Sequence, residues 1–245
     1  MSRGNFPHTF RGVDFSDRPI LIHNLIYVQC KGAAIAENSD ADDHHKYPMS
    51  RAAVFLDRDG VLNIEAGYIR KVEDLHLISG VAQAVRQLND RGLFCCLVSN
   101  QSGPARGYYP ASHVDALHDR LCRLLQKEAG ARLDALYYCP YLSHPEGGTD
   151  PQYTRYSTWR KPNTGMFVAA AWEHDLDISQ SFMVGDKATD IDMAHNAGCT
   201  GILVQTGFGK QVLSGDYQHE TQPDYIATDL ADAAHWILEQ KSDVI

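Results

Sequence analysis

The most informative stretch of this chain reads Ala52-Ala53-Val54-Phe55-Leu56-Asp57-Arg58-Asp59-Gly60-Val61-Leu62-Asn63. It begins as a short apolar run of strand character and continues with two aspartates separated by one residue. Residues i and i+2 of an extended backbone lie on the same side, so Asp57 and Asp59 can face one pocket. Carboxylates that close repel each other unless a cation or a reaction occupies the space between them. Taken alone, such a pair is more often a solvated acidic turn, so its meaning depends on the rest of the chain.

From residue 51 onward, short apolar runs alternate with segments of helical periodicity. Strands are expected at residues 52–56, 93–98, 133–138, 181–184 and 200–204, and helices at 81–91, 111–129, 164–174, 188–197 and 229–240. Strands that are apolar on both faces and alternate with helices indicate a parallel sheet covered on both sides. We therefore expect an α/β protein with a Rossmann-like three-layer domain and a mainly parallel sheet. The stretch 103–130 is too short for a large cap domain.

Polar side chains follow four of these predicted strands at their carboxyl ends, where folds of this class bind ligands. The groups are the aspartate pair, Ser99-Asn100-Gln101-Ser102, Arg160-Lys161, and Asp186-Lys187 with Asp190. Each group alone has an ordinary explanation as a turn, a surface cation or a carboxylate at a helix N-terminus. Their convergence on one edge of the sheet favours a reaction site.

The reactive groups suit phosphoryl transfer. Asp57 can attack phosphorus and form an aspartyl-phosphate, while Asp59 can protonate the leaving oxygen and later accept a proton from water. Magnesium prefers hard oxygen ligands, which Asp57, Asp186 and a backbone carbonyl near Asp59 would supply.

The other strand ends would stabilise the transferring group. Ser99 and the Asn100 N–H are expected to hold its oxygens, and Lys161 to neutralise its charge together with the metal.

These residues resemble, in order, the four motifs of the haloacid-dehalogenase-like phosphatases. The motifs are Asp57-Arg58-Asp59-Gly60, Ser99-Asn100, Lys161, and Gly185-Asp186 with Asp190. Residues 51–240 are most similar to the heptose-bisphosphate and histidinol phosphatases of that superfamily, on segments that include Gly67-Tyr68, Ala105-Arg106-Gly107 and Arg160-Lys161-Pro162. The resemblance implies a magnesium-dependent phosphoric monoester hydrolase that acts on a small sugar phosphate through an aspartyl-phosphate.

The resemblance also implies substrate contacts and a reaction. Substrate-binding residues are expected to be Glu65, Tyr68, Asn100, Gln101, Ser102, Arg106 and Arg160, with Lys187 and Asp190 in support. The implied reaction removes the 7-phosphate of D-glycero-D-manno-heptose 1,7-bisphosphate, and histidinol phosphate or another small metabolite is the alternative substrate. An aspartyl-phosphate signalling module is disfavoured, because it needs no acid two residues after its nucleophile.

One segment departs from this family, whose members commonly hold a structural zinc ion through a Cys-x-His and a Cys-x-Cys pair. Cys139 and His144 remain here, but Ser157 and Trp159 stand where the second pair would be, so four ligands are lacking. We therefore expect no structural zinc. The loop 140–160 would instead be ordered by aromatic packing of Tyr141, Tyr153, Tyr156 and Trp159.

Composition restricts the partners of this 245-residue chain. Its formal net charge of −9 and lack of a basic stripe argue against nucleic acid and anionic membrane surfaces. No apolar run approaches the roughly 20 residues of a membrane-spanning helix. Six scattered cysteines give no sign of a disulfide framework, so a cytoplasmic enzyme is expected. The expected partner is a small phosphorylated metabolite, and the oligomeric state stays open.

Residues 1–50 differ from the rest, because they are polar and carry little periodic apolar pattern. We expect a poorly ordered extension, or a functional chain that begins near Met49. The apolar run at residues 20–28 is the one part that could add an edge strand.

Overall fold

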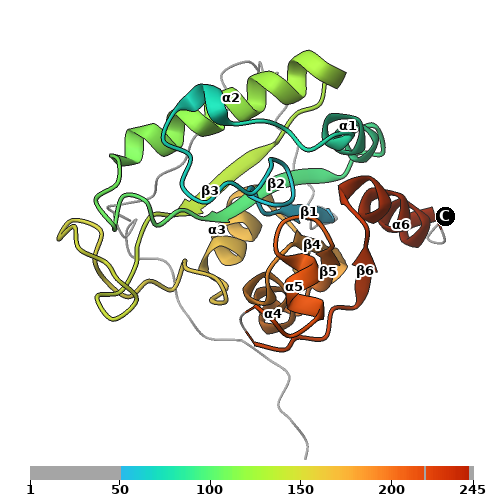
Figure 1. The fold of residues 1–245 in the computed structure, drawn as a ribbon. Helices are drawn as coiled ribbons and strands as arrows, with labels where there is room; N and C mark the ends of the chain where they lie inside the picture. The colour runs from blue at the N-terminus through green and yellow to red at the C-terminus, as the bar shows by residue number, and fades with distance from the viewer. Residues whose placement is uncertain (1–50, 218, 243–245) are drawn as a thin grey trace, which may run out of the picture.

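The computed structural model describes residues 51–217 and 219–242, so the expected N-terminal extension 1–50 lies outside the described residues. A parallel sheet of six strands has the order β3-β2-β1-β4-β5-β6 (Figure 1). The strands are β1 (Ala53–Leu56), β2 (Phe94–Asn100), β3 (Ala135–Cys139), β4 (Phe182–Gly185), β5 (Thr200–Val204) and β6 (Tyr225–Ala227). The helices are α1 (Val81–Asp90), α2 (Ala111–Ala129), α3 (Gly165–His174), α4 (Ala188–Ala197), α5 (Gly209–Leu213) and α6 (Leu230–Ser242), with short 3-10 helices η1 (Val72–Asp74) and η2 (Ile178–Gln180).

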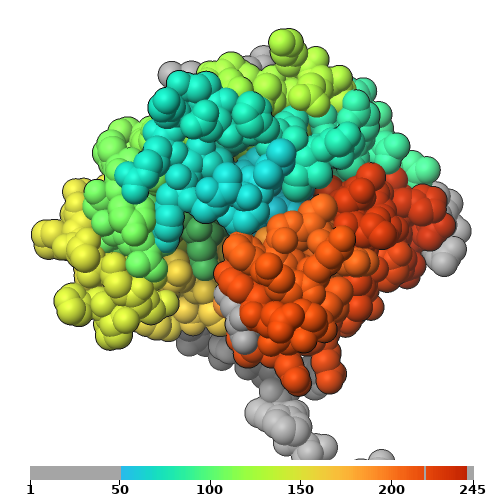
Figure 2. All heavy atoms as spheres, viewed as in Figure 1, coloured from blue at the N-terminus to red at the C-terminus, as the bar shows by residue number. Residues whose placement is uncertain are grey.

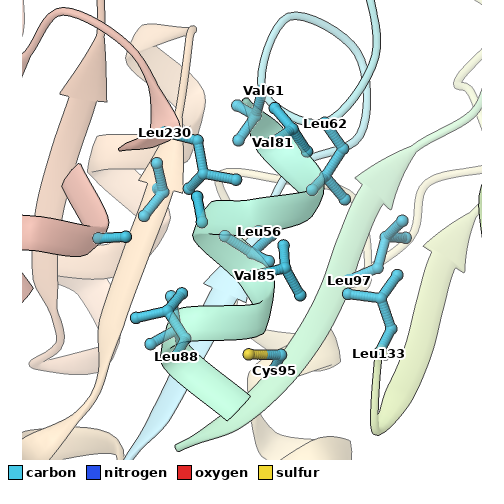
Figure 3. Close-up of a cluster of buried hydrophobic side chains, with 14 of the residues drawn as sticks. Leu56, Val61, Leu62, Val81, Val85, Leu88, Cys95, Leu97, Leu133 and Leu230 are labelled. Carbon is cyan, nitrogen blue, oxygen red and sulfur yellow. The ribbon is translucent and has the colours of Figure 1, made fainter. Parts of the chain in front are cut away.

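Alternate residues of the strands contribute to two separate hydrophobic cores. In β1, Val54 and Leu56 belong to the core formed with α1, α2 and α6, whereas Ala53 and Phe55 belong to the core formed with α3 and α4. Figure 3 shows the first of these cores, where Leu56 lies close to Val85 of α1. Burial on both faces explains why the strands read as continuous apolar runs in the sequence.

The two central strands, β1 and β4, mark the point where the chain reverses direction across the sheet. The chain passes from β1 outward to β2 and β3, and then returns to β4 and continues outward to β5 and β6. Leu56, the last residue of β1, pairs with Leu97 of β2 and with Val184 of β4; β4 ends one residue beyond this pair, and β2 continues to Asn100 at the same edge of the sheet. The loops that follow them therefore open together, at the position where open α/β sheets bind ligands.

The predicted fold class is confirmed, and the predicted elements lie within two residues of the observed ones at nearly every boundary. Four short elements were not predicted, because β6, η1 and η2 have three residues each and α5 has five, too few to establish a periodic pattern. Among the described residues there is no separate cap domain, and none of their helices has the length and hydropathy needed to cross a membrane.

Candidate active site

Asp57 lies directly after β1 and is almost fully buried. Its backbone N–H donates to the carbonyl of Val184, which ties the end of β1 to β4. Its Oδ1 atom accepts hydrogen bonds from the Ser99 hydroxyl at 2.8 Å and the Arg58 N–H at 2.7 Å, and lies 3.0 Å from the Lys161 ammonium. The structure thus brings together three of the predicted catalytic residues, Asp57, Ser99 and Lys161.

Asp59 has a different set of partners. The Arg58 guanidinium donates from Nη2 to both carboxylate oxygens, at 3.0 and 2.9 Å, and the Asn63 amide donates at 2.9 Å. Burial by itself raises the pKa of Asp59, but Arg58, Asn63 and Gln101 together lower it below its ordinary value. The Asp59 carboxyl is therefore held ionised and fixed in orientation.

Gln101 links the two aspartates. Its Nε2 atom donates to Asp59 Oδ2 at 2.9 Å and to Ser99 Oγ at 3.0 Å, and Ser99 in turn donates to Asp57. Gln101 was predicted as a substrate contact, and the structure places it in contact with Asp59 and Ser99, two of the residues predicted to be catalytic. The supporting positions of Arg58 and Asn63 were missed by the sequence analysis, although both stand inside the motif that it singled out.

Lys161 is buried between two carboxylates. Its Nζ atom lies 3.0 Å from Asp57 and 2.5 Å from Asp190, and donates to the Val98 carbonyl at 3.2 Å. Burial lowers the pKa of Lys161, but Asp190 and Asp57 outweigh that effect and the pKa is raised. The Asn100 side chain accepts the Lys161 N–H and donates to the Lys161 carbonyl, so it positions this lysine from β2.

A buried acidic cluster is formed by Asp57, Asp186 and Asp190, whose ligand oxygens all lie within 4.8 Å of one another. The pKa of Asp186 is raised to about 7, chiefly by burial and further by Asp57 and Asp190, while Lys187 opposes the shift. Negative charge is thus in excess, and a divalent cation with hard oxygen ligands would relieve it. The side chain of Asp59 points to its own partners, which leaves its backbone carbonyl as the predicted contribution to a metal site.

Two glycines make room for Asp186. A Cβ atom built on Gly60 would lie 2.2 Å from Asp186 Oδ2, and one on Gly207 would lie 2.1 Å from the same oxygen. Both glycines have positive φ angles, 82° and 56°, which other residues rarely adopt. The adjacent Phe208 N–H donates to Asp186 Oδ2 at 2.9 Å, so the loop after β5 completes the site.

The remaining predicted residues lie around this centre. Lys187 contacts both Asp186 and Glu65 at 3.1 Å, and the Tyr68 hydroxyl lies 3.2 Å from the Ser102 hydroxyl. In Figure 2 the surface is hollowed where the cyan residues after β1 meet the orange and yellow segments.

The two predicted arginines, Arg106 and Arg160, both contact Glu146. Sequence analysis did not single out Glu146, because no pattern marked it among the other polar residues of its loop.

The loop between β3 and α3 is ordered without any cluster of metal ligands among the described residues other than the aspartates. Leu142 and Thr154 of this loop form an isolated bridge, in which the Leu142 N–H donates to the Tyr153 carbonyl and the Arg155 N–H donates to the Leu142 carbonyl. The Tyr141 and Tyr153 rings lie 6.0 Å apart, and the Arg155 guanidinium lies 3.9 Å above the Tyr141 ring.

The expected aromatic packing of this loop is therefore correct in part. Trp159 packs against the core beside Tyr137, whereas Tyr156 is 72% exposed and its hydroxyl donates to Asn163. Cys139 is buried, and its thiol donates to the Tyr141 carbonyl. Burial also raises the pKa of this thiol, so it stays protonated.

A carboxylate pair, a lysine, a hydroxyl and a second acidic group at the reversal point of a parallel sheet define a class of hydrolases. Consistent with this class, residues 158–233 match the family model described as HAD-hydrolase-like.

Known relatives narrow the class. The chain is 71% identical over 189 residues to the D-glycero-D-manno-heptose-1,7-bisphosphate 7-phosphatase of Thermosynechococcus vestitus, a match that spans 77% of this chain and 96% of that protein. It is 40% identical over 190 residues to the D-glycero-beta-D-manno-heptose-1,7-bisphosphate 7-phosphatase of Haemophilus ducreyi, spanning 77% of this chain and all of that protein (100%).

Solved structures agree. The D,D-heptose 1,7-bisphosphate phosphatase of B. bronchiseptica, complexed with magnesium and phosphate, has a TM-score of 0.67 at 31% identity, over 77% of this chain and 99% of that one. A putative HAD-like phosphatase from Mesorhizobium loti has a TM-score of 0.64 at 32% identity, over 80% of this chain and 90% of that one. The chain therefore belongs to the haloacid-dehalogenase-like phosphatases and is a phosphoric monoester hydrolase.

Proposed function

We propose that this protein removes the 7-phosphate of D-glycero-D-manno-heptose 1,7-bisphosphate with the help of magnesium. The proposed substrate is supported by the 71% identity to a relative whose name states this activity, in a match that spans 96% of that relative. The observation that carries the chemistry is the pair Asp57 and Asp59, whose carboxylates have separate partners and can take separate roles.

Asp57 is the proposed nucleophile. The hydrogen bonds and the lysine contact that this carboxylate makes with other described residues converge on Oδ1, which leaves Oδ2 to attack phosphorus. The bond that forms joins Oδ2 to phosphorus, and the bond that breaks joins phosphorus to the sugar oxygen. Ser99 and Lys161 are placed to hold the phosphoryl oxygens, because both already contact the nucleophile.

Asp59 is the proposed general acid and base. It donates a proton to the departing sugar oxygen, and in the second half-reaction it accepts a proton from the water that releases phosphate from Asp57. Arg58 and Gln101 keep its carboxylate oriented between these steps. Because Arg58 favours the ionised form, protonation of Asp59 has to accompany substrate binding.

Asp57, Asp186 and the backbone carbonyl of Asp59 are the proposed magnesium ligands. When bound there, the ion supplies positive charge that offsets the negative charge of the phosphoryl group. Asp190 supports the site indirectly, since it contacts Lys161 and accepts a hydrogen bond from the Lys187 N–H at 3.1 Å. We propose that the chain holds no structural zinc, because the β3–α3 loop is ordered by backbone pairing and ring contacts instead.

We also propose that residues 51–240 form the phosphatase domain and that the enzyme works in the cytoplasm on a small phosphorylated metabolite. A charged sugar phosphate does not cross a lipid bilayer unaided, which supports that location. The net charge of −9 speaks against nucleic-acid or membrane partners. Glu65, Tyr68 and Ser102 would border the sugar, with Arg106 and Arg160 at the distal phosphate.

The test is a phosphate-release panel on the purified, untagged protein, with heptose 1,7-bisphosphate, other sugar bisphosphates and histidinol phosphate. The heptose bisphosphate should have the highest kcat/KM, activity should vanish on chelation, and added magnesium should restore it. A higher kcat/KM for histidinol phosphate would reject the proposed substrate. One tightly bound zinc per chain in elemental analysis would reject the zinc-free loop.

A further inference from the structure

Glu146 joins two arginines that come from different connections of the sheet. Arg106, between β2 and α2, donates from Nη2 to the Glu146 carbonyl at 3.1 Å. Arg160, between β3 and α3, has its Nε atom 3.5 Å from Glu146 Oε1. Lys161 and Lys187 contact aspartates of the centre, whereas Arg106 and Arg160 contact Glu146 and are the cations assigned above to the distal phosphate.

The Glu146 carboxylate is itself held in a fixed orientation. Both the hydroxyl and the backbone N–H of Ser143 donate to Oε2, which directs Oε1 toward Arg160. The Ser143 hydroxyl is the main cause of a lowered Glu146 pKa; partial burial opposes it and Arg160 adds to it. The carboxylate is thus ionised. Its Oε2 atom accepts hydrogen bonds from Ser143, and its Oε1 atom accepts from Arg160.

The contacts with Glu146 leave other arginine donors available. Arg160 Nη1 and Arg106 Nε are buried atoms that have no hydrogen-bond partner among the described residues. A buried donor without an acceptor is unfavourable, and a phosphate oxygen would satisfy it. Glu146 contacts Arg160 at Nε, so this contact does not use the Nη1 and Nη2 donors, and paired guanidinium donors suit the bidentate binding of phosphate.

The backbone around Glu146 is fitted to Arg106. A Cβ atom on Gly147 would lie 2.6 Å from Arg106 Nη1, so the loop packs directly against the guanidinium. The loop is anchored next to this arginine, because the N–H groups of Thr149 and Asp150 both donate to the Ala105 carbonyl, at 2.7 and 3.0 Å.

We propose that Glu146 positions Arg106 and Arg160 as a pair, and that it thereby sets the preference of the enzyme for substrates with a second phosphate. The inference rests on the proposed function, since the distal phosphate is the ligand of the pair. Glu146 acts through the arginines and does not touch the substrate. Direct competition between Glu146 and phosphate is disfavoured, because the single contact is at Nε and does not use the Nη1 or Nη2 donors of Arg160.

The test compares Glu146→Ala with Glu146→Gln, which keeps an oxygen that can accept from Arg160. The substrates are heptose 1,7-bisphosphate and p-nitrophenyl phosphate, which carries one phosphate. In Glu146→Ala, KM for the bisphosphate should rise about tenfold with kcat unchanged, while KM for the aryl phosphate stays the same. Glu146→Gln should stay within about twofold of wild type. Glu239→Ala, which removes an exposed carboxylate from α6, is the control and should change nothing.

An unchanged KM in Glu146→Ala would overturn the proposal. A lowered KM would also overturn it, because Glu146 would then compete with phosphate. An equal rise of KM for both substrates would overturn it as well, because the effect of Glu146 would then not depend on the second phosphate. If wild type does not hydrolyse the heptose bisphosphate, the proposed substrate fails separately. The comparison is then made with fructose 1,6-bisphosphate as an inhibitor of aryl phosphate hydrolysis, and its inhibition should weaken in Glu146→Ala but not in Glu146→Gln.

Discussion

Asp57 and Asp59 are separated by one residue, yet each carboxylate has its own environment. Asp57 faces a hydroxyl, a lysine and two further aspartates, whereas Asp59 faces a guanidinium and two amides. Carboxylates in different environments can perform different chemistry on one substrate. The residue that separates them, Arg58, is itself the main partner of Asp59 and keeps the second carboxylate turned away from the first.

Replacing the proposed nucleophile should abolish turnover without unfolding the protein. Asp57→Asn keeps the size of the side chain but removes the attacking charge and a metal ligand, so kcat should fall by several orders of magnitude. The melting temperature should be unchanged or higher, because one of three clustered carboxylates has lost its charge. Both quantities are measured beside Asp90→Asn, a control at an exposed ion pair of α1. Retention of more than a few per cent of activity would exclude Asp57 as the nucleophile.

The loss caused by Asp59→Asn should depend on the leaving group. A sugar alcohol is a poor leaving group and needs a proton, whereas an activated aryl phosphate needs less help. Burst kinetics should therefore show a larger loss in the first step for the sugar phosphate than for the aryl phosphate. Hydrolysis of the intermediate should slow for both substrates alike, since it is the same species. Equal losses in the first step would argue against Asp59 as the acid.

The elements that carry the site were predictable because their sequence signals are local. β1 and β4 are buried on both faces and end directly before Asp57 and Asp186, and β2 is buried on both faces up to Ser99, which lies within it. Each of these strands therefore reads as an apolar run that stops at a polar residue. The short β6 and α5 give no such signal. Glu146 could not be predicted from the sequence either, because its contacts with Arg106 and Arg160 depend on how the loop between β3 and α3 folds.

The helix α2 contains a buried histidine that makes stability depend on pH. His118 is fully buried beside the Tyr138 ring, and neither ring nitrogen has a hydrogen-bond partner among the described residues. Burial, and secondarily Arg58, lowers its pKa well below the ordinary value. The unfolded chain therefore binds the proton first, and this histidine reduces stability as pH falls below about 6.5.

His118→Phe should remove that part of the acid sensitivity, because the phenyl ring cannot be protonated. The difference in the free energy of unfolding between variant and wild type should shift in favour of the variant by up to about 1.4 kcal/mol per pH unit below pH 6.5. Urea titrations at pH 7.5, 6.5 and 5.5 measure this shift, whatever the offset between the two proteins at pH 7.5. A difference that is constant with pH would show that His118 titrates normally in the folded state.

At the scale of the whole molecule, deletion of residues 1–48 should leave folding and kcat/KM nearly unchanged. The relative from Thermosynechococcus vestitus is matched over 96% of its length by 77% of this chain, which supports this expectation. Thermal unfolding and phosphate release check this expectation, and a large fall in melting temperature would contradict it.

A deletion that continues through residue 52 is the matched control. It removes Arg51, whose backbone pairs with Asp175 and Asp177 and whose guanidinium lies 4.5 Å from the Phe94 ring centroid. This longer deletion should lower the melting temperature measurably, since it removes both the backbone hydrogen bonds of Arg51 and the contact of its guanidinium with Phe94.

The close approach of Gly60 and Gly207 to Asp186 has a consequence for how such an enzyme can evolve. Any side chain at either glycine would occupy the space of the Asp186 carboxylate, so a substitution there should disrupt the proposed metal site whatever the substrate. A side chain at Gly207, in the loop after β5, therefore cannot serve to change the substrate specificity. New substrates have to be acquired through the segments that follow β1, β2 and β3, where side chains border the open part of the site.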